Sequence, residues 1–220
     1  MTISPGAAKT VIIAVFIVPI LIYLYLYNFS HPVRENVPFV YQVENGDSTI
    51  RSLPEFSLEN LAGESITHDD LLGNICFVSF FSLEEDTLSR VLHGNLQRTY
   101  KNLDWEREPS IRFVNINTGD SLAAIQSYRD KLENLDSRFW LSLHGADSVI
   151  HNFAGKALDL PKFREEPQGA YQKTSQYVGL FDKEGRLRKF YIGTDLAHER
   201  KMQEDIIALI RMEYPEELKR

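Results

Sequence analysis

The chain has 220 residues, of which 43% are hydrophobic and 25% are charged, and its formal net charge at pH 7 is −7. A composition of this kind is typical of a globular protein and excludes disordered and collagen-like chains. Nucleic-acid-binding proteins usually present a basic face, and no such face is visible in this acidic sequence. We therefore expect no nucleic-acid partner.

The apolar residues concentrate near the N-terminus, where residues 10–29 form a run of twenty positions without a charged side chain. As a helix this run would extend over roughly 30 Å, the thickness of the hydrocarbon core of a bilayer. The run ends in tyrosines rather than in a small-residue cleavage site, which favours a transmembrane anchor over a cleaved signal peptide. Lys9 precedes the run and no acidic residue does. We therefore expect residues 1–9 in the cytoplasm and residues 30–220 on the periplasmic side of the inner (plasma) membrane.

Beyond the anchor, residues 30–52 contain prolines and are expected to form a tether with one possible edge strand at residues 39–43. A single folded domain is expected over residues 53–214, followed by a short tail at residues 215–220.

Strands and helices alternate through this domain. A short hairpin at 56–67 and a helical turn at 69–73 come first. Hydrophobic spacing then predicts strands at residues 75–81, 111–117 and 139–143 and helices at 85–103, 122–132 and 147–154. An irregular loop is expected at 160–173, and a hairpin at 177–192 and a closing helix from 194 onward complete the domain.

This order predicts a three-layer α/β fold in which a central mixed sheet carries helices on both faces, with the closing hairpin and helix of a thioredoxin-like domain. Cys76 is the only cysteine and lies in an apolar run, so it is expected to be a buried small hydrophobe. The chain cannot form an internal disulfide. The basic run at residues 186–189 is expected to be the solvent side of a strand.

Several stretches carry a family resemblance through their order and spacing. Residues 53–60 read LPEFSLEN, 70–75 read DLLGNI, 180–188 read LFDKEGRLR and 191–195 read YIGTD. Between Leu53 and Tyr214 the sequence thus resembles the Sco (SenC) family, membrane-tethered thioredoxin-fold proteins associated with copper delivery to cytochrome c oxidase.

The resemblance implies a site built from two cysteines, separated by three residues, and a later histidine. Thiolates and imidazole suit Cu(I), and a dithiol at a helix N-terminus can also perform redox chemistry. In this chain the corresponding positions are Glu85, Ser89 and Thr174. We therefore expect no catalytic residue, no metal ligand and no cofactor at the family's site.

Two alternatives place a metal elsewhere. The carboxylates Glu84, Glu85 and Asp86 could hold a hard cation such as Ca²⁺, although acidic residues are also common in the first turn of a helix. His144 and His151 could bind copper as unconventional ligands, but no third ligand stands at the usual short spacing.

A third alternative is a redox enzyme that uses the Cys76 thiol. His93 and His198 are expected to be ordinary surface or boundary residues.

The favoured interpretation is a non-enzymatic accessory or binding protein in the assembly of a respiratory oxidase. Its partner would be another envelope protein, such as an oxidase subunit or an intact Sco relative. If a surface of the domain is used for binding, the segment Ser82–Ser89 and the loop Leu160–Lys173 are the first candidates because they flank the family's site.

Overall fold

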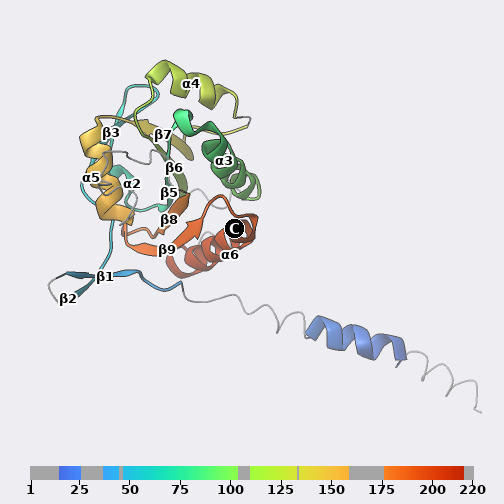
Figure 1. Ribbon diagram of the computed structural model, residues 1–220. Coiled ribbons are helices and arrows are strands. Elements are labelled where there is room, and N and C mark those ends of the chain that lie inside the picture. Colours follow the sequence, from blue (N-terminus) through green and yellow to red (C-terminus); the bar gives the residue numbers. More distant parts are fainter. Residues whose placement is uncertain are drawn as a thin grey trace, which may run out of the picture. The chain divides into compact units, whose positions relative to one another are not determined.

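The computed structural model describes residues 15–25, 37–44, 47–103, 110–132, 134–158 and 176–215, without the side chains of Glu44, Glu85 and Asp86. The chain divides into two units, Met1–Glu35 and Asn36–Arg220 (Figure 1). Residues 15–25 of the first unit are helical. Among the described residues, no helix combines the length and the apolar character that crossing a bilayer requires. The expected anchor at residues 10–29 lies partly outside the described residues, and it stays a prediction.

The second unit is built on a mixed sheet of seven strands in the order β4-β3-β7-β6-β5-β8-β9. The strands β5, β6 and β7 run parallel to one another, and the remaining neighbours are antiparallel. The bounds are β3 (Ser57–Asn60), β4 (Ser65–Thr67), β5 (Ile75–Phe81), β6 (Ile111–Asn117), β7 (Trp140–His144), β8 (Tyr177–Phe181) and β9 (Leu187–Ile192). The predicted mixed sheet is confirmed.

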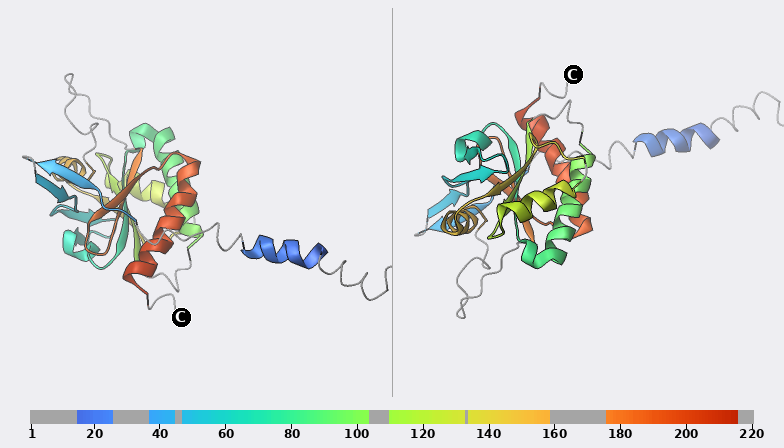
Figure 2. Two further views of the ribbon diagram at one scale, coloured as in Figure 1. Left: turned by 90° about the horizontal axis from the view of Figure 1, so that it is seen from below. Right: turned by 90° about the horizontal axis from the view of Figure 1, so that it is seen from above.

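Helices cover both faces of this sheet (Figures 1 and 2). They are α2 (His68–Leu71), η1 (Leu83–Glu85), α3 (Asp86–Lys101), α4 (Leu122–Asp130), α5 (Asp147–Leu158) and α6 (Leu196–Glu213). Alternate residues of β5 point to opposite faces, so Phe77 packs in the core beneath α3 and α6, whereas Val78 packs in the core beneath α5. The predicted three-layer, thioredoxin-like fold is therefore confirmed.

The described residues between 37 and 52, which precede the predicted start of the domain, are part of this unit. The strands β1 (Tyr41–Glu44) and β2 (Asp47–Ile50) form a separate two-stranded hairpin, of which only the first strand was predicted. The base of the hairpin bonds to the outer edge of β9, where the Val40 amide donates to the Leu187 carbonyl at 2.9 Å and the Leu187 amide donates to the Arg51 carbonyl at 2.7 Å. The compact unit thus begins at Asn36, earlier than the predicted start at Leu53, because this segment satisfies the open edge of the sheet.

Candidate functional site: the head of helix α3 and the α3–α4 groove

The carboxyl ends of the parallel strands β5, β6 and β7 lie at one edge of the sheet, where open α/β folds place their ligand sites. At this edge the chain leaves β5 through Ser82 and enters η1 and α3. We call this region the head of α3. It is the place to which the family resemblance assigns the two cysteines.

A carboxylate from the loop after β6 is hydrogen-bonded to the head of α3. Asp120 accepts hydrogen bonds from the Leu83 amide at 2.7 Å and from Asn117 Nδ2 at 2.6 Å. The Asp120 amide in turn donates to Asn117 Oδ1 at 2.9 Å. These contacts satisfy a backbone donor that would otherwise be unpaired at the start of a helix, and they fix the loop after β6 to the start of η1.

Ser89 also forms a hydrogen bond at the head of α3. Its side chain is fully buried, and its hydroxyl donates to the Ser82 carbonyl at 2.7 Å. The Ser82 hydroxyl accepts a hydrogen bond from the Glu84 amide at 3.2 Å. Glu85 lies in η1 with a side chain outside the described residues, and Thr174 lies outside them altogether. Of the three predicted positions, the structure describes the side chain of Ser89, and its hydroxyl is hydrogen-bonded within the protein.

The Cys76 thiol lies far from the head of α3 in the fold. Cys76 is at the start of β5, the end opposite the head of α3, and its side chain is 1% exposed. Burial raises the pKa of the Cys76 thiol to about 12. The thiol is therefore protonated at neutral pH and is a weak nucleophile and a weak metal ligand.

No third ligand accompanies the two histidines considered as copper ligands in the described part of the chain. His151 Nδ1 lies 2.7 Å from the Asp147 carbonyl, one turn earlier in α5, and the buried His144 Nε2 has no hydrogen-bond partner among the residues that the structure describes. Within the described parts of the chain, one group of three His, Cys, Asp or Glu side chains brings its ligand atoms within 4.8 Å of one another. That group contains neither histidine.

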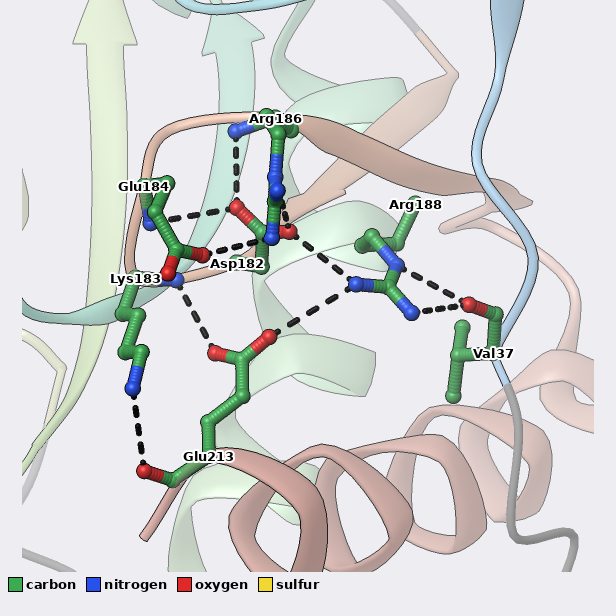
Figure 3. A network of polar contacts seen from close by, with 7 residues as sticks. All are labelled: Val37, Asp182, Lys183, Glu184, Arg186, Arg188 and Glu213. Carbon is green, nitrogen blue, oxygen red and sulfur yellow. Dashed lines mark hydrogen bonds and ion pairs between the residues drawn. The ribbon is translucent and has the colours of Figure 1, made fainter. Parts of the chain in front are cut away.

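The group consists of Asp182, Glu184 and Glu213, and its carboxylates are paired with basic side chains (Figure 3). Arg186 bonds to Asp182 at 2.9 Å and to Glu184 at 2.6 Å. Arg188 bonds to Asp182 at 3.0 Å and approaches Glu213 to 3.6 Å. We therefore interpret the cluster as a structural ion-pair network rather than as a metal centre.

The same network corrects the interpretation of residues 186–189 as a solvent-facing run. Arg188 is 2% exposed, and its guanidinium donates to the Val37 carbonyl while covering the ring of Phe39 at 4.0 Å. The segment that enters the unit at Val37 covers the outer edge of β9. Asp182, six residues before Arg188 in the sequence, could have indicated that Arg188 is paired and buried.

His93 is also buried, contrary to the expectation of a surface or boundary residue. It is 1% exposed and lies among the rings of Phe81, Tyr128 and Trp140, with centroid distances between 4.5 and 5.9 Å. Its Nδ1 lies 2.9 Å from the hydroxyl of Tyr128, which comes from α4. Desolvation lowers the pKa of His93 to about 3, so the imidazole is neutral.

The expectation for His198 agrees with its half-buried position, beside Tyr191. The signal for His93 was its spacing, because it lies four residues after the buried Ser89 and next to Leu92 on the inner side of α3.

A groove of about 660 Å³ begins beside the head of α3 and separates α3 from α4. Its lining includes three small residues, Gly94 of α3 and Ala124 and Ser127 of α4. Among the side chains that the structure describes, the charged ones in this lining are Arg90 and Lys131. Sequence reasoning did not find this groove, because its existence depends on the spacing between two helices that are not consecutive in the chain, since β6 lies between them.

Comparisons with known proteins agree with the architecture. No family model matches the chain, and no curated protein matches it significantly. Among solved structures, BsSco, described as a member of the Sco family of cytochrome c oxidase assembly proteins, superposes with a TM-score of 0.61 at 18% identity, covering 74% of this chain and 95% of that one. A SCO1/SenC family lipoprotein from Bacillus anthracis gives a TM-score of 0.60 at 19% identity, with 72% and 95% covered. Yeast Sco1 gives 0.56 at 17% identity, with 73% and 98% covered. The chain therefore has the thioredoxin-like fold of the Sco proteins.

Proposed function

We propose that the chain is a membrane-anchored, Sco-like protein that has lost the copper and dithiol site and acts by binding, as an accessory in the assembly of a respiratory oxidase. The observation that carries this proposal is the head of α3. There, where the resemblance expects a thiol, the buried Ser89 hydroxyl is bonded to the Ser82 carbonyl. The fold supports the link to Sco proteins, and the oxidase pathway is inferred from that likeness.

The donor atoms at this position do not fit Cu(I). Cuprous ion prefers sulfur ligands, whereas Ser89 offers a hydroxyl already engaged with the backbone, and Glu85 would offer carboxylate oxygen. Dithiol exchange is equally unsupported, because it requires a thiolate and the chain has one buried cysteine with a raised pKa. We therefore propose that the protein is not an enzyme and has no copper cofactor.

The proposed location follows from the sequence of the N-terminal unit. Residues 10–29 would anchor the chain in the inner (plasma) membrane, and the compact unit from Asn36 onward would face the periplasm. The proposed partner is another envelope protein, either an oxidase subunit or an intact Sco relative.

Titration of the full-length protein with Cu(I) against a chromogenic cuprous chelator tests the loss of the site. We expect the unmodified protein to take no copper from the chelator. The triple variant Glu85→Cys, Ser89→Cys, Thr174→His should gain one equivalent, because it restores the family's ligand set on the same fold. Stoichiometric copper on the unmodified protein would overturn the proposal, and failure of the triple variant would contradict the correspondence of these three positions.

A genetic test addresses the pathway. Deletion of the gene should lower the amount of assembled, active oxidase in membranes, measured by oxygen consumption and haem spectra. The Cys76→Ala variant should restore it fully, because the thiol has no chemical role. Unchanged oxidase after deletion would contradict the assembly role, and failure of Cys76→Ala at normal protein levels would instead support thiol chemistry.

A further inference from the structure

Helix α4 has less buried apolar surface than the other long helices. Among the described residues between Asp120 and Asp136, only Ile125 is buried. By contrast, α6 buries several apolar side chains, among them Met202 and Leu209. Because hydrophobic burial is the main force that holds a helix against a sheet, we expect α4 to have a lower local stability than α6.

Two hollows border α4. One is the α3–α4 groove, which Ala124 and Ser127 of α4 help to line. The other has a volume of about 550 Å³ and is lined by Arg129 of α4, by the turn after β3 and by residues Trp140–Ser142 of β7. The helix therefore lacks close neighbours over much of its length, unlike a helix packed within a core.

Polar contacts supplement the burial of Ile125. The hydroxyl of Tyr128 lies 2.9 Å from His93 Nδ1, and Gln126 Nε2 donates to the Leu61 carbonyl at 3.4 Å. The second distance is close to the limit for a hydrogen bond. The contact between Tyr128 and His93 thus acts as a polar latch between α4 and α3.

The chain is fixed on either side of this segment. Asp120 accepts a hydrogen bond from the Leu83 amide at 2.7 Å, and the Asp136 amide donates to the hydroxyl of Tyr100 at 2.9 Å. Residues 121–135 can therefore detach from the core while the strands before and after them stay in the sheet.

Two ring nitrogens lie beneath α4 without partners. His93 Nε2 and Trp140 Nε1 are buried, and neither has a hydrogen-bond partner among the described residues. Opening of α4 would let water reach both atoms, which offsets part of the cost of separating the helix from the core. The groups that face the imidazole are Phe81 of β5, Asn115 of β6, Trp140 of β7 and Tyr128 of α4, and none of them is charged at neutral pH.

We propose that residues 121–135, with α4 as their main element, form a lid that opens locally over His93 and Trp140, and that protonation of His93 favours the open state. In the closed state, burial lowers the pKa of His93 from about 6.5 to about 3. The open state therefore takes up the proton first as the pH falls, and opening increases between pH 6.5 and 3. This inference goes beyond the proposed function and depends neither on the oxidase pathway nor on the loss of copper.

Amide hydrogen exchange of the full-length protein tests whether α4 opens alone. The amides of α4 should be about a hundredfold less protected than those of α6. Tyr191→Phe removes the hydrogen bond that the Tyr191 hydroxyl donates to Asp205 of α6 at 2.8 Å. This variant should lower the protection of α6 by about tenfold and leave that of α4 unchanged. Equal protection of the two helices, or equal losses in the variant, would mean that α4 opens only with the whole domain and would overturn the proposal.

Cysteine modification tests whether the inner side of α4 becomes accessible. Ile125→Cys places a thiol under the lid, and Ile206→Cys in α6 is the matched control, because the two isoleucines are 1% and 0% exposed. The buried Cys76 serves as a reference in the same molecule. Peptide mass spectrometry at pH 7 should show the introduced thiol of Ile125→Cys reacting about a hundredfold faster than that of Ile206→Cys. Equal rates would show that the core beneath α4 stays covered, contrary to the proposal.

Two histidine variants test the dependence on pH. After correction for the intrinsic exchange rate, the protection of the α4 amides should fall by about twentyfold between pH 7 and pH 5. His93→Gln should remove this fall, whereas His198→Gln, which changes a half-buried histidine in the first turn of α6, should retain it. A fall that persists in His93→Gln would place the proton elsewhere and would overturn the proposed role of His93.

Discussion

The two flanks of helix α3 contrast sharply. On the flank toward α6, Leu92 and Leu96 are fully buried and Asn95 Nδ2 donates to the Gly193 carbonyl at 2.8 Å. A Cβ on Gly193 would come within 2.4 Å of Leu92 Cδ1, so this side has no spare room. On the flank toward α4, a Cβ on Gly94 would touch nothing, and the space is an open groove.

Because of this contrast, substitutions on the two flanks of α3 are expected to affect different properties. Substitutions on the α6 flank change the packed core, so their effects should appear in the free energy of unfolding. Substitutions on the α4 flank change a surface that the fold leaves unoccupied, so they should be neutral or stabilising for the fold. Substitutions on the α4 flank therefore leave the packing of the α6 flank unchanged.

The largest expected effect is on the packed flank. Leu92→Ala should reduce the free energy of unfolding by about 2–5 kcal/mol, because it opens a cavity in a fully buried cluster. The matched control is Val91→Ala, since Val91 is the preceding residue of the same helix and is 43% exposed. Its effect should stay within about 0.5 kcal/mol. Urea denaturation measures both, and similar losses would contradict the close packing inferred for Leu92.

Gly193→Ala tests the same flank by overfilling it. The added methyl group would collide with Leu92 and with Val178 Cγ2 at 2.6 Å, so we expect a loss of about 1–3 kcal/mol in the free energy of unfolding. The same exchange at Gly155, which has open space, provides the control in chemical denaturation. A neutral result at Gly193 would mean that the α6 flank adapts easily, contrary to its close packing.

His93 is buried in α3 and contacts Tyr128, which lines the groove on the α4 side. Its pKa is lowered from about 6.5 to about 3, so the unfolded chain takes up the proton first as the pH falls. Stability should therefore be lost between pH 6.5 and 3, at a slope of about 1.4 kcal/mol per pH unit from this residue alone. His93→Gln should flatten the measured dependence by that amount between pH 6 and 4. An unchanged slope would show that His93 is accessible to protons in the folded protein.

The smallest expected effect has the opposite sign. Gly94→Ala should raise the free energy of unfolding by up to about 1 kcal/mol, because alanine favours the helix and its methyl group meets no neighbour. Thermal and urea unfolding would detect the gain. A loss of stability would show that the fold does need glycine at this position, and that the groove is less open than its geometry indicates.

Periodicity predicted most of the fold, because the spacing of apolar residues reflects which face of each element is buried. The strand at 75–81 and the helix at 86–101 lie close to their expected positions for this reason. The composition of the α3 head could also be read directly, since Glu85 and Ser89 stand where the resemblance expects cysteines.

The errors concern residues whose surroundings come from distant parts of the chain. Arg188 is buried because Val37 and Phe39 cover the edge of β9, and His93 is buried because α4 and β7 supply Tyr128 and Trp140. The spacing of apolar residues around Arg188 and around His93 does not reveal these contacts, because the contacting residues are distant in the sequence. The strand β2 was missed because its sequence, DSTI, is mostly polar and exposed.

The contact between Arg188 and Val37 has a mechanical consequence. Tension applied to the chain ahead of Val37 would reach the guanidinium of Arg188 first, and through Asp182 and Glu213 it would pass to the turn after β8 and the last turn of α6. The backbone hydrogen bonds of Val40, Arg51 and Leu53 with Gly185 and Leu187 would share the remaining load. These contacts would then have to break before a pull on the N-terminal segment reached the central strands.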